Sequence, residues 1–329
     1  MIKKIKIILS KKQQLQFAIL FFGILIAAIL EMVGVGSIPI FINLLLKPEQ
    51  VFSYVPPNKF LDFIINRDYL GQILIAGGLL LIIFLFKNIF IFFVNYMQTS
   101  LFQQIKIKNS KRLINAYLTS PYSLHLDRNP ATIHRNVLGE VVHAAKFLDL
   151  LMVCMREILV VLVIFILLLL VDPITSLAVF SIIGFFAVIF NYITKKKITY
   201  LSKLSQTHRE RQVKIINQIF GAIKDIKILD KEKYFINEFN NETKGAMKIE
   251  FFSRVISLIP RLSIEILGIA AILFVTSFLL FASGYSIEAT IPILSLLGVA
   301  TIRMIPSFNL LSGSIAMMRQ TYVSFNLVV

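Results

Sequence analysis

Five charged residues of particular interest lie within long apolar stretches of the sequence: Glu31, Lys87, Arg261, Glu265 and Arg303. On insertion scales, a charge at the centre of a membrane span costs roughly 2.5–3.5 kcal/mol, so such charges usually face a cavity or a partner. Three of the five are cations, so one cation stays unpaired even if both glutamates form ion pairs. A polar cavity with excess positive charge is suited to an anionic group such as a phosphate or pyrophosphate.

A purely structural interpretation of these charges is also open. Arg261 and Glu265 are four residues apart, so they share a helix face and could pair. Glu31 and Glu265 would then only neutralise two cations inside a helical bundle. In the functional interpretation, the planar guanidinium groups of Arg261 and Arg303 hold phosphate oxygens with two parallel hydrogen bonds.

Two prolines, Pro260 and Pro306, stand close to the two arginines. Each removes a backbone N–H and can kink its helix. An ordinary irregularity of packing and a role in gating are both compatible with this position.

The sequence offers no catalytic or metal-binding cluster. A membrane-embedded transferase would need Asp or His residues gathered at one interface with metal-ligand spacing, and none are. A phosphate-binding loop requires a Gly-Lys step, which is absent from the chain. The histidines lack metal spacing and are expected on a solvated surface; they are His125, His134, His143 and His208.

The elements that must position the five charges are long membrane helices. Hydrophobic residues make up 57% of the 329 residues and charged residues 16%, against about 25% charged residues in soluble domains. A span needs about 20 apolar residues. We therefore predict an all-α membrane protein with six spans, at residues 15–46, 70–105, 152–171, 174–194, 255–283 and 289–318.

The distribution of basic residues predicts the orientation of these spans. Of the 34 Lys and Arg residues, 27 fall in three segments: the N-terminus, residues 106–156 and residues 195–254. Because cytoplasmic segments are enriched in Lys and Arg, this side and both termini are expected in the cytosol. The formal net charge of +16 then reflects orientation and contact with lipid headgroups, and not nucleic-acid binding.

Two of the cytosolic segments resemble the intracellular loops of the transmembrane half of ABC exporters. Residues 121–127, followed by Thr132 to Val141, resemble the first loop, and residues 220–229, followed by Lys233 to Phe235, resemble the second. The resemblance covers residues 1–329 and implies six long helices that extend into the cytosol. It also implies two short coupling helices that touch an ATPase domain, the second near Asp225 to Tyr234. The residues expected in these coupling helices are Tyr122, His125, Asp127, Asp225, Leu229 and Tyr234.

Within that family, three short motifs resemble the flippases of lipid-linked oligosaccharides that serve bacterial N-glycosylation. They are Ile29-Leu30-Glu31, Ile259-Pro260-Arg261 with Glu265, and residues 303–307. In those flippases, cavity arginines are thought to engage the pyrophosphate of the cargo. Arg261 and Arg303 match two of these positions, and Lys87 keeps the charge of the third without its fork.

The resemblance implies an ATP-driven flippase of a lipid-linked oligosaccharide or a similar phosphate-headed amphiphile, in the plasma (inner) membrane. An exporter of another lipid, a peptide or a drug is the alternative. The chain would act as a homodimer with a nucleotide-binding domain that binds ATP and Mg²⁺. That domain is absent from residues 1–329, so we expect either that the sequence is a fragment or that the ATPase is a separate polypeptide; ATP hydrolysis would be an activity of the complete protein.

Overall fold

A computed structural model describes residues 9–53, 64–65, 67–123, 133, 136–281 and 287–328. For some helical residues, most of them between positions 174 and 206, it describes the backbone alone. The described residues fold almost entirely into helices, in two compact units. Residues 1–177 and 271–329 form the first unit, and residues 178–270 form the second.

The first predicted span is confirmed as helix α2, Lys11–Leu46. Its start is fixed by Ser10, whose hydroxyl accepts a hydrogen bond from the Gln13 backbone N–H while the Gln13 side chain accepts one from the Ser10 N–H. This reciprocal cap satisfies two donors that the first turn would leave without partners. The polar segment from Lys47 to Asp68, whose Pro56-Pro57 pair predicts a loop, begins with a short helix, α3, Pro48–Ser53.

Helix α5, Tyr69–Leu118, contains the second predicted span. Its 50 residues would measure about 75 Å at 1.5 Å per residue, well beyond a hydrocarbon core of about 30 Å. The length of α5 agrees with the prediction that this helix projects into water.

Helix α8, Val141–Val171, follows a short π-helix, η1, Asn136–Glu140. A single residue, Asp172, separates α8 from α9, Pro173–Gly221, as the sequence predicts for the turn between spans three and four. Helix α12, Ile287–Val328, contains the sixth predicted span and continues through Pro306 and a second proline, Pro292.

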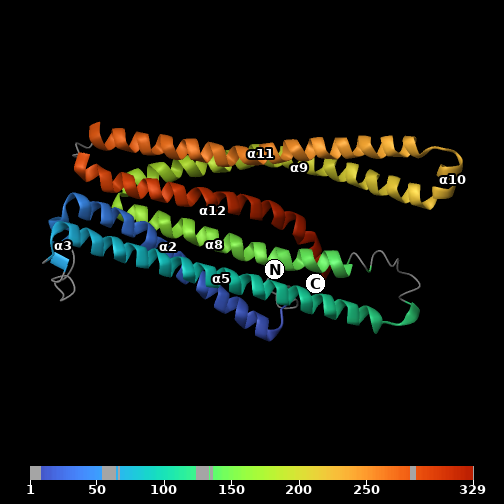
Figure 1. Ribbon diagram of the computed structural model, residues 1–329, viewed down its shortest axis with the longest axis horizontal. Helices are drawn as coiled ribbons and strands as arrows, with labels where there is room; N and C mark the ends of the chain where they lie inside the picture. The colour runs from blue at the N-terminus through green and yellow to red at the C-terminus, as the bar shows by residue number, and fades with distance from the viewer. Residues whose placement is uncertain are drawn as a thin grey trace. The chain divides into compact units, whose positions relative to one another are not determined.

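In the first unit, α2, α5, α8 and α12 pack side by side (Figure 1). Their buried apolar residues form one core, in which Ile24, Ile105, Leu148 and Phe325 have no measurable exposure. The Phe147 and Phe325 rings lie 4.7 Å apart between their centroids and join α8 to α12. This core fixes the relative positions of the four helices, three of which carry the charged residues Glu31, Lys87 and Arg303.

The second unit is a helical hairpin made of most of α9, α10 (Ile223–Ile228) and most of α11 (Glu232–Phe281). Asp230 makes the turn before α11 with φ 51°, a left-handed conformation that Asp tolerates better than most residues. The predicted fifth span lies in α11, which passes position 260 without a break, so any kink at Pro260 stays a prediction.

Four helices of the described residues are long and apolar enough to cross a membrane. They are α2, α5, the η1–α8 segment and the Thr290–Met318 part of α12. The fourth and fifth predicted spans fall in α9 and α11, where many side chains lie outside the described residues. The all-helical membrane fold is thus confirmed, and the count of six spans stays a prediction.

Candidate functional site

Three of the five predicted charges meet inside the first unit. Glu31 of α2 is 4% exposed and Lys87 of α5 is 6% exposed. The Lys87 Nζ lies 3.5 Å from Glu31 Oε1, and Arg303 of α12 donates its Nε–H to the same oxygen. We name Glu31, Lys87 and Arg303 the charge cluster. Its residues are separated by 56 and 272 positions in sequence, so only the fold brings them together.

Lys87 is held closely by its neighbours. A Cβ atom added at Gly34 would lie 3.0 Å from Lys87 Cδ and 3.1 Å from its Nζ, so the glycine leaves the room that the lysine occupies. On another side, the ammonium lies 4.4 Å from the centroid of the Phe84 ring, within the range of a cation–π contact. Glu31 and Gly34 are three apart on α2, which places both on the face that meets Lys87.

Arg303 is the most accessible member of the charge cluster. Its side chain is 30% exposed, against 8% for Lys87 and 5% for Glu31. Its Nη1 donates a hydrogen bond of 3.4 Å to Ser307 Oγ, one turn further along α12. The guanidinium is therefore oriented by two helices and still reachable.

The charge cluster has a net charge of +1, because two cations share one carboxylate. In a low-dielectric region, such an excess favours an anion strongly. An ammonium and a guanidinium that converge on one oxygen are also the donors that bind phosphate oxygens. The cluster therefore has the charge and the donors that an anionic group requires.

The other two predicted charges, Arg261 and Glu265, lie on α11 in the second unit. Glu265 is exposed within the chain, and the side chain of Arg261 lies outside the described residues. Their pairing with each other, and their grouping with the charge cluster, stay predictions.

A second polar group was missed by the sequence analysis. Asn95 and Gln98 of α5 bind Arg156 and Asp149 of α8, with a Gln98 Nε2 to Asp149 Oδ1 distance of 2.7 Å. Glu157, 2% exposed, accepts a hydrogen bond of 3.0 Å from Arg156 Nε. Its second oxygen, Oε2, is buried without a hydrogen-bond partner among the described residues. The charges at positions 156 and 157 inside predicted span three were the signal for this group.

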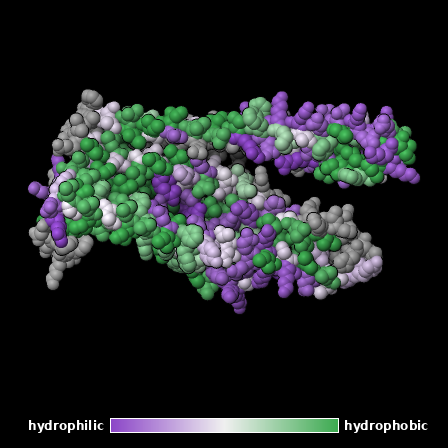
Figure 2. All heavy atoms as spheres, in the orientation of Figure 1, coloured by the Kyte–Doolittle hydropathy of each residue, from purple (hydrophilic) through white to green (hydrophobic). Residues whose placement is uncertain are grey.

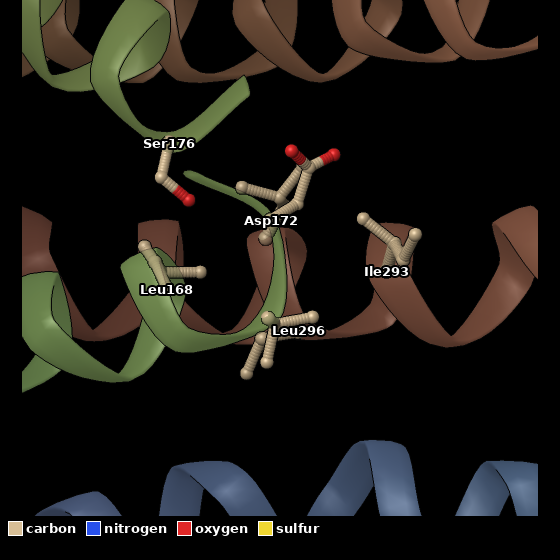
Figure 3. Close-up of a pocket in the computed structure, with 7 residues that line it drawn as sticks. Leu168, Asp172, Ser176, Ile293 and Leu296 are labelled. Carbon is tan, nitrogen blue, oxygen red and sulfur yellow. The ribbon is translucent and has the colours of Figure 1, made fainter. Parts of the chain in front are cut away.

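A hollow of about 170 Å³, part of it open space, lies at the turn between α8 and α9 (Figure 3). Leucine and isoleucine side chains such as Leu168, Ile293 and Leu296 line most of it. Asp172 and Ser176 are the polar residues at its edge. The four predicted charges whose side chains the structure describes do not line this hollow.

The coupling segments are described only in part. Tyr122 is exposed in a short helical turn after Pro121, and His125 and Asp127 lie outside the described residues. In the second loop the predicted limits are wrong: α10 ends at Ile228, Leu229 follows it, and Tyr234 lies in the first turn of α11. The helix ends earlier than predicted because Asp230 adopts a left-handed conformation, which ends it.

The 3–4 spacing of Val213, Ile216, Phe220, Ile223 and Ile226 predicts one apolar helical stripe in this loop. Within the chain, Val213, Ile216 and Phe220 of α9 are 57%, 40% and 72% exposed. Of the two stripe residues on α10, Ile223 is 42% exposed and Ile226 is buried.

His208 is not solvated surface, contrary to the sequence prediction. Its Nδ1 lies 2.6 Å from Glu242 Oε2, across the hairpin from α9 to α11. The ring approaches so closely because residue 245 is glycine: a Cβ there would lie 2.7 Å from His208 Cε1. The hydrogen bond with His208, followed by the charge of Arg211, lowers the pKa of Glu242. His143 is exposed, as predicted, and His125 and His134 lie outside the described residues.

This contact predicts acid-dependent opening of the hairpin. Because the pKa of Glu242 is lowered in the folded state, its contribution to stability is complete above the unfolded pKa and is lost as pH falls through the folded pKa. Amide hydrogen exchange around residue 242 should therefore accelerate as pH falls from 7 towards 4, after correction for intrinsic rates. His208→Ala should reduce this pH dependence, and Glu232→Gln, which removes another carboxylate of lowered pKa, should not. An unchanged profile in His208→Ala would contradict the assignment.

Comparison with known protein families matches residues 21–304 to the ABC transporter transmembrane region. The match covers most of the chain and contains Glu31, Lys87 and Arg303. It agrees with the long helices that extend beyond a bilayer. As the membrane part of such a transporter, the protein is a multi-pass membrane protein that works with a nucleotide-binding domain among membrane lipids. The chain belongs to the ABC transporter transmembrane region family.

Proposed function

We propose that the chain is the membrane half of an ATP-driven flippase whose cargo is an amphiphile with a phosphate or pyrophosphate head, such as a lipid-linked oligosaccharide. The charge cluster carries this proposal, because it presents two cations and a net charge of +1 in a region where charge is costly. The motifs around Glu31, Pro260 and Arg303, which resemble those of the lipid-linked oligosaccharide flippase PglK, support it. The head would bind Lys87, Arg261 and Arg303, and the tail would stay in lipid.

The end of the hairpin that carries α10 is the proposed contact with the nucleotide-binding domain. This end is mainly hydrophilic with an island of hydrophobic residues (Figure 2). Phe220, Ile228 and Leu229 are 72%, 70% and 63% exposed there. ATP and Mg²⁺ would bind on that domain, and α10 would transmit its closure to the membrane helices.

A second copy of the chain is the proposed partner of the hairpin. Within the chain, Met247, Phe251 and Phe252 of α11 are 52%, 63% and 48% exposed. Two helices alone cannot cover their apolar faces, so these faces need lipid or another protein surface. We place both termini in the cytosol and the homodimer in the plasma membrane.

Transport can be tested in proteoliposomes that contain the protein together with its nucleotide-binding domain. A fluorescent prenyl pyrophosphate should change leaflet when ATP and Mg²⁺ are supplied, and the matching prenyl alcohol should not. Transport of both probes, or of a peptide or a drug in preference to them, would favour the alternative cargo classes and contradict an anionic head.

A further inference from the structure

The two cations of the charge cluster converge on one oxygen. Glu31 Oε1 accepts from Arg303 Nε and lies 3.5 Å from Lys87 Nζ. This is the arrangement that a phosphate oxygen would make with the same two groups, because both anions present oxygen acceptors to charged donors. A carboxylate of the chain itself therefore occupies the place that the ligand's anion would take.

Burial explains why an internal anion is present. Two cations in a low-dielectric region are costly to leave without an anion, and a carboxylate offsets part of that cost. Glu31 supplies a single negative charge to two positive ones, so the compensation is incomplete. A pyrophosphate head carries more negative charge than a carboxylate, and it would satisfy both cations more fully.

The two cations differ in their freedom to exchange partners. Lys87 is confined by the backbone at Gly34 and by the Phe84 ring. Arg303 has a side chain that is 30% exposed and a second contact with Ser307 at 3.4 Å, so its guanidinium can turn while one hydrogen bond is kept. The bond from Arg303 to Glu31 is thus the one that a ligand can displace.

We propose that Glu31 is an internal competitor of the cargo: it holds Arg303 while the site is empty and gives it up when the anionic head binds. This inference rests on the proposed function, since it assumes that an anionic head reaches the charge cluster. Glu31 then lowers the affinity for cargo. It also helps to release the cargo, because its hydrogen bond with Arg303 forms again when the anionic head leaves.

The test is the binding of farnesyl pyrophosphate to the purified protein in nanodiscs, by titration calorimetry, with farnesol as the neutral probe. Glu31→Gln removes the competing charge, so its Kd should fall at least tenfold relative to the unmodified protein. Glu157→Gln is the matched control, because it removes another buried carboxylate, which accepts its hydrogen bond from Arg156, and its Kd should not change. Arg303→Gln should raise the Kd.

The outcomes separate the two proposals. If Arg303→Gln weakens binding but Glu31→Gln leaves the Kd unchanged, the competitor role is wrong and the anion site stands. If neither the unmodified protein nor Glu31→Gln binds farnesyl pyrophosphate more tightly than farnesol, the anionic cargo fails and the competitor role fails with it. If Glu31→Gln does not fold, Glu31→Asp decides: its shorter side chain should weaken the contact and lower the Kd about two- to threefold, and an unchanged Kd would overturn the inference.

Discussion

Replacement of Arg303 by Gln should lower ATP-driven transport of a prenyl pyrophosphate ten- to a hundredfold while leaving the fold intact. A hydrogen bond to a charged group contributes about 1.5–3 kcal/mol, and each 1.4 kcal/mol is about a tenfold change in an equilibrium constant. The fold should survive because Arg303→Gln leaves Glu31 paired with Lys87, so the remaining cluster is neutral. The initial rate of probe transfer in proteoliposomes measures the first effect, and thermal unfolding of the purified protein measures the second.

Two further variants show whether charge or geometry matters at position 303. Arg303→Lys keeps the positive charge but loses the planar fork, so it should retain part of the transport. Lys146→Gln also removes one positive charge, from a pair with Asp149 whose lysine side chain is 43% exposed, and it should transport at the normal rate. A normal rate in Arg303→Gln would show that the cluster only neutralises charge inside the bundle.

The long helices and the family could be predicted because their signals are local. A run of apolar residues interrupted by a proline turn is visible in any window of the sequence, and the Asp172-Pro173 step marks the boundary between α8 and α9 within one residue. The short helix α10 was placed less well, because its end depends on the backbone conformation of a single residue, Asp230.

The partners within the site could not be predicted, because they depend on the relative rotation of helices far apart in sequence. Glu31 and Arg303 were identified as unusual by their charge alone, but spacing places each only on a face of its own helix. The prediction that His208 is solvated failed for the same reason, since its partner Glu242 lies on the returning helix. The need for glycine at positions 34 and 245 becomes visible only in the structure, where Lys87 and His208 pack against them.

Arg156→Leu should be among the most destabilising single substitutions in the first unit. Glu157 is 2% exposed and takes its hydrogen bond from Arg156 Nε at 3.0 Å. Without the arginine, the carboxylate is buried with no opposite charge, and breaking a buried pair in this way costs about 3–5 kcal/mol. The free energy of unfolding, measured by denaturant titration in mixed micelles, should fall by that amount.

The two single substitutions, at Arg156 and at Glu157, should cost different amounts of stability. This difference distinguishes a buried charge without a partner from a general loss of packing. Glu157→Gln leaves Arg156 with Asn95 and with a side chain that is 19% exposed, so the arginine can extend its head towards a polar region. Its cost should be only about 1–2 kcal/mol. The double variant Arg156→Leu/Glu157→Gln should recover more than half of the stability lost by Arg156→Leu, because no charge is then buried. If the losses in the free energy of unfolding simply add in the double variant, Arg156 stabilises α8 by packing. The charge of Glu157 would then not need Arg156 as its partner.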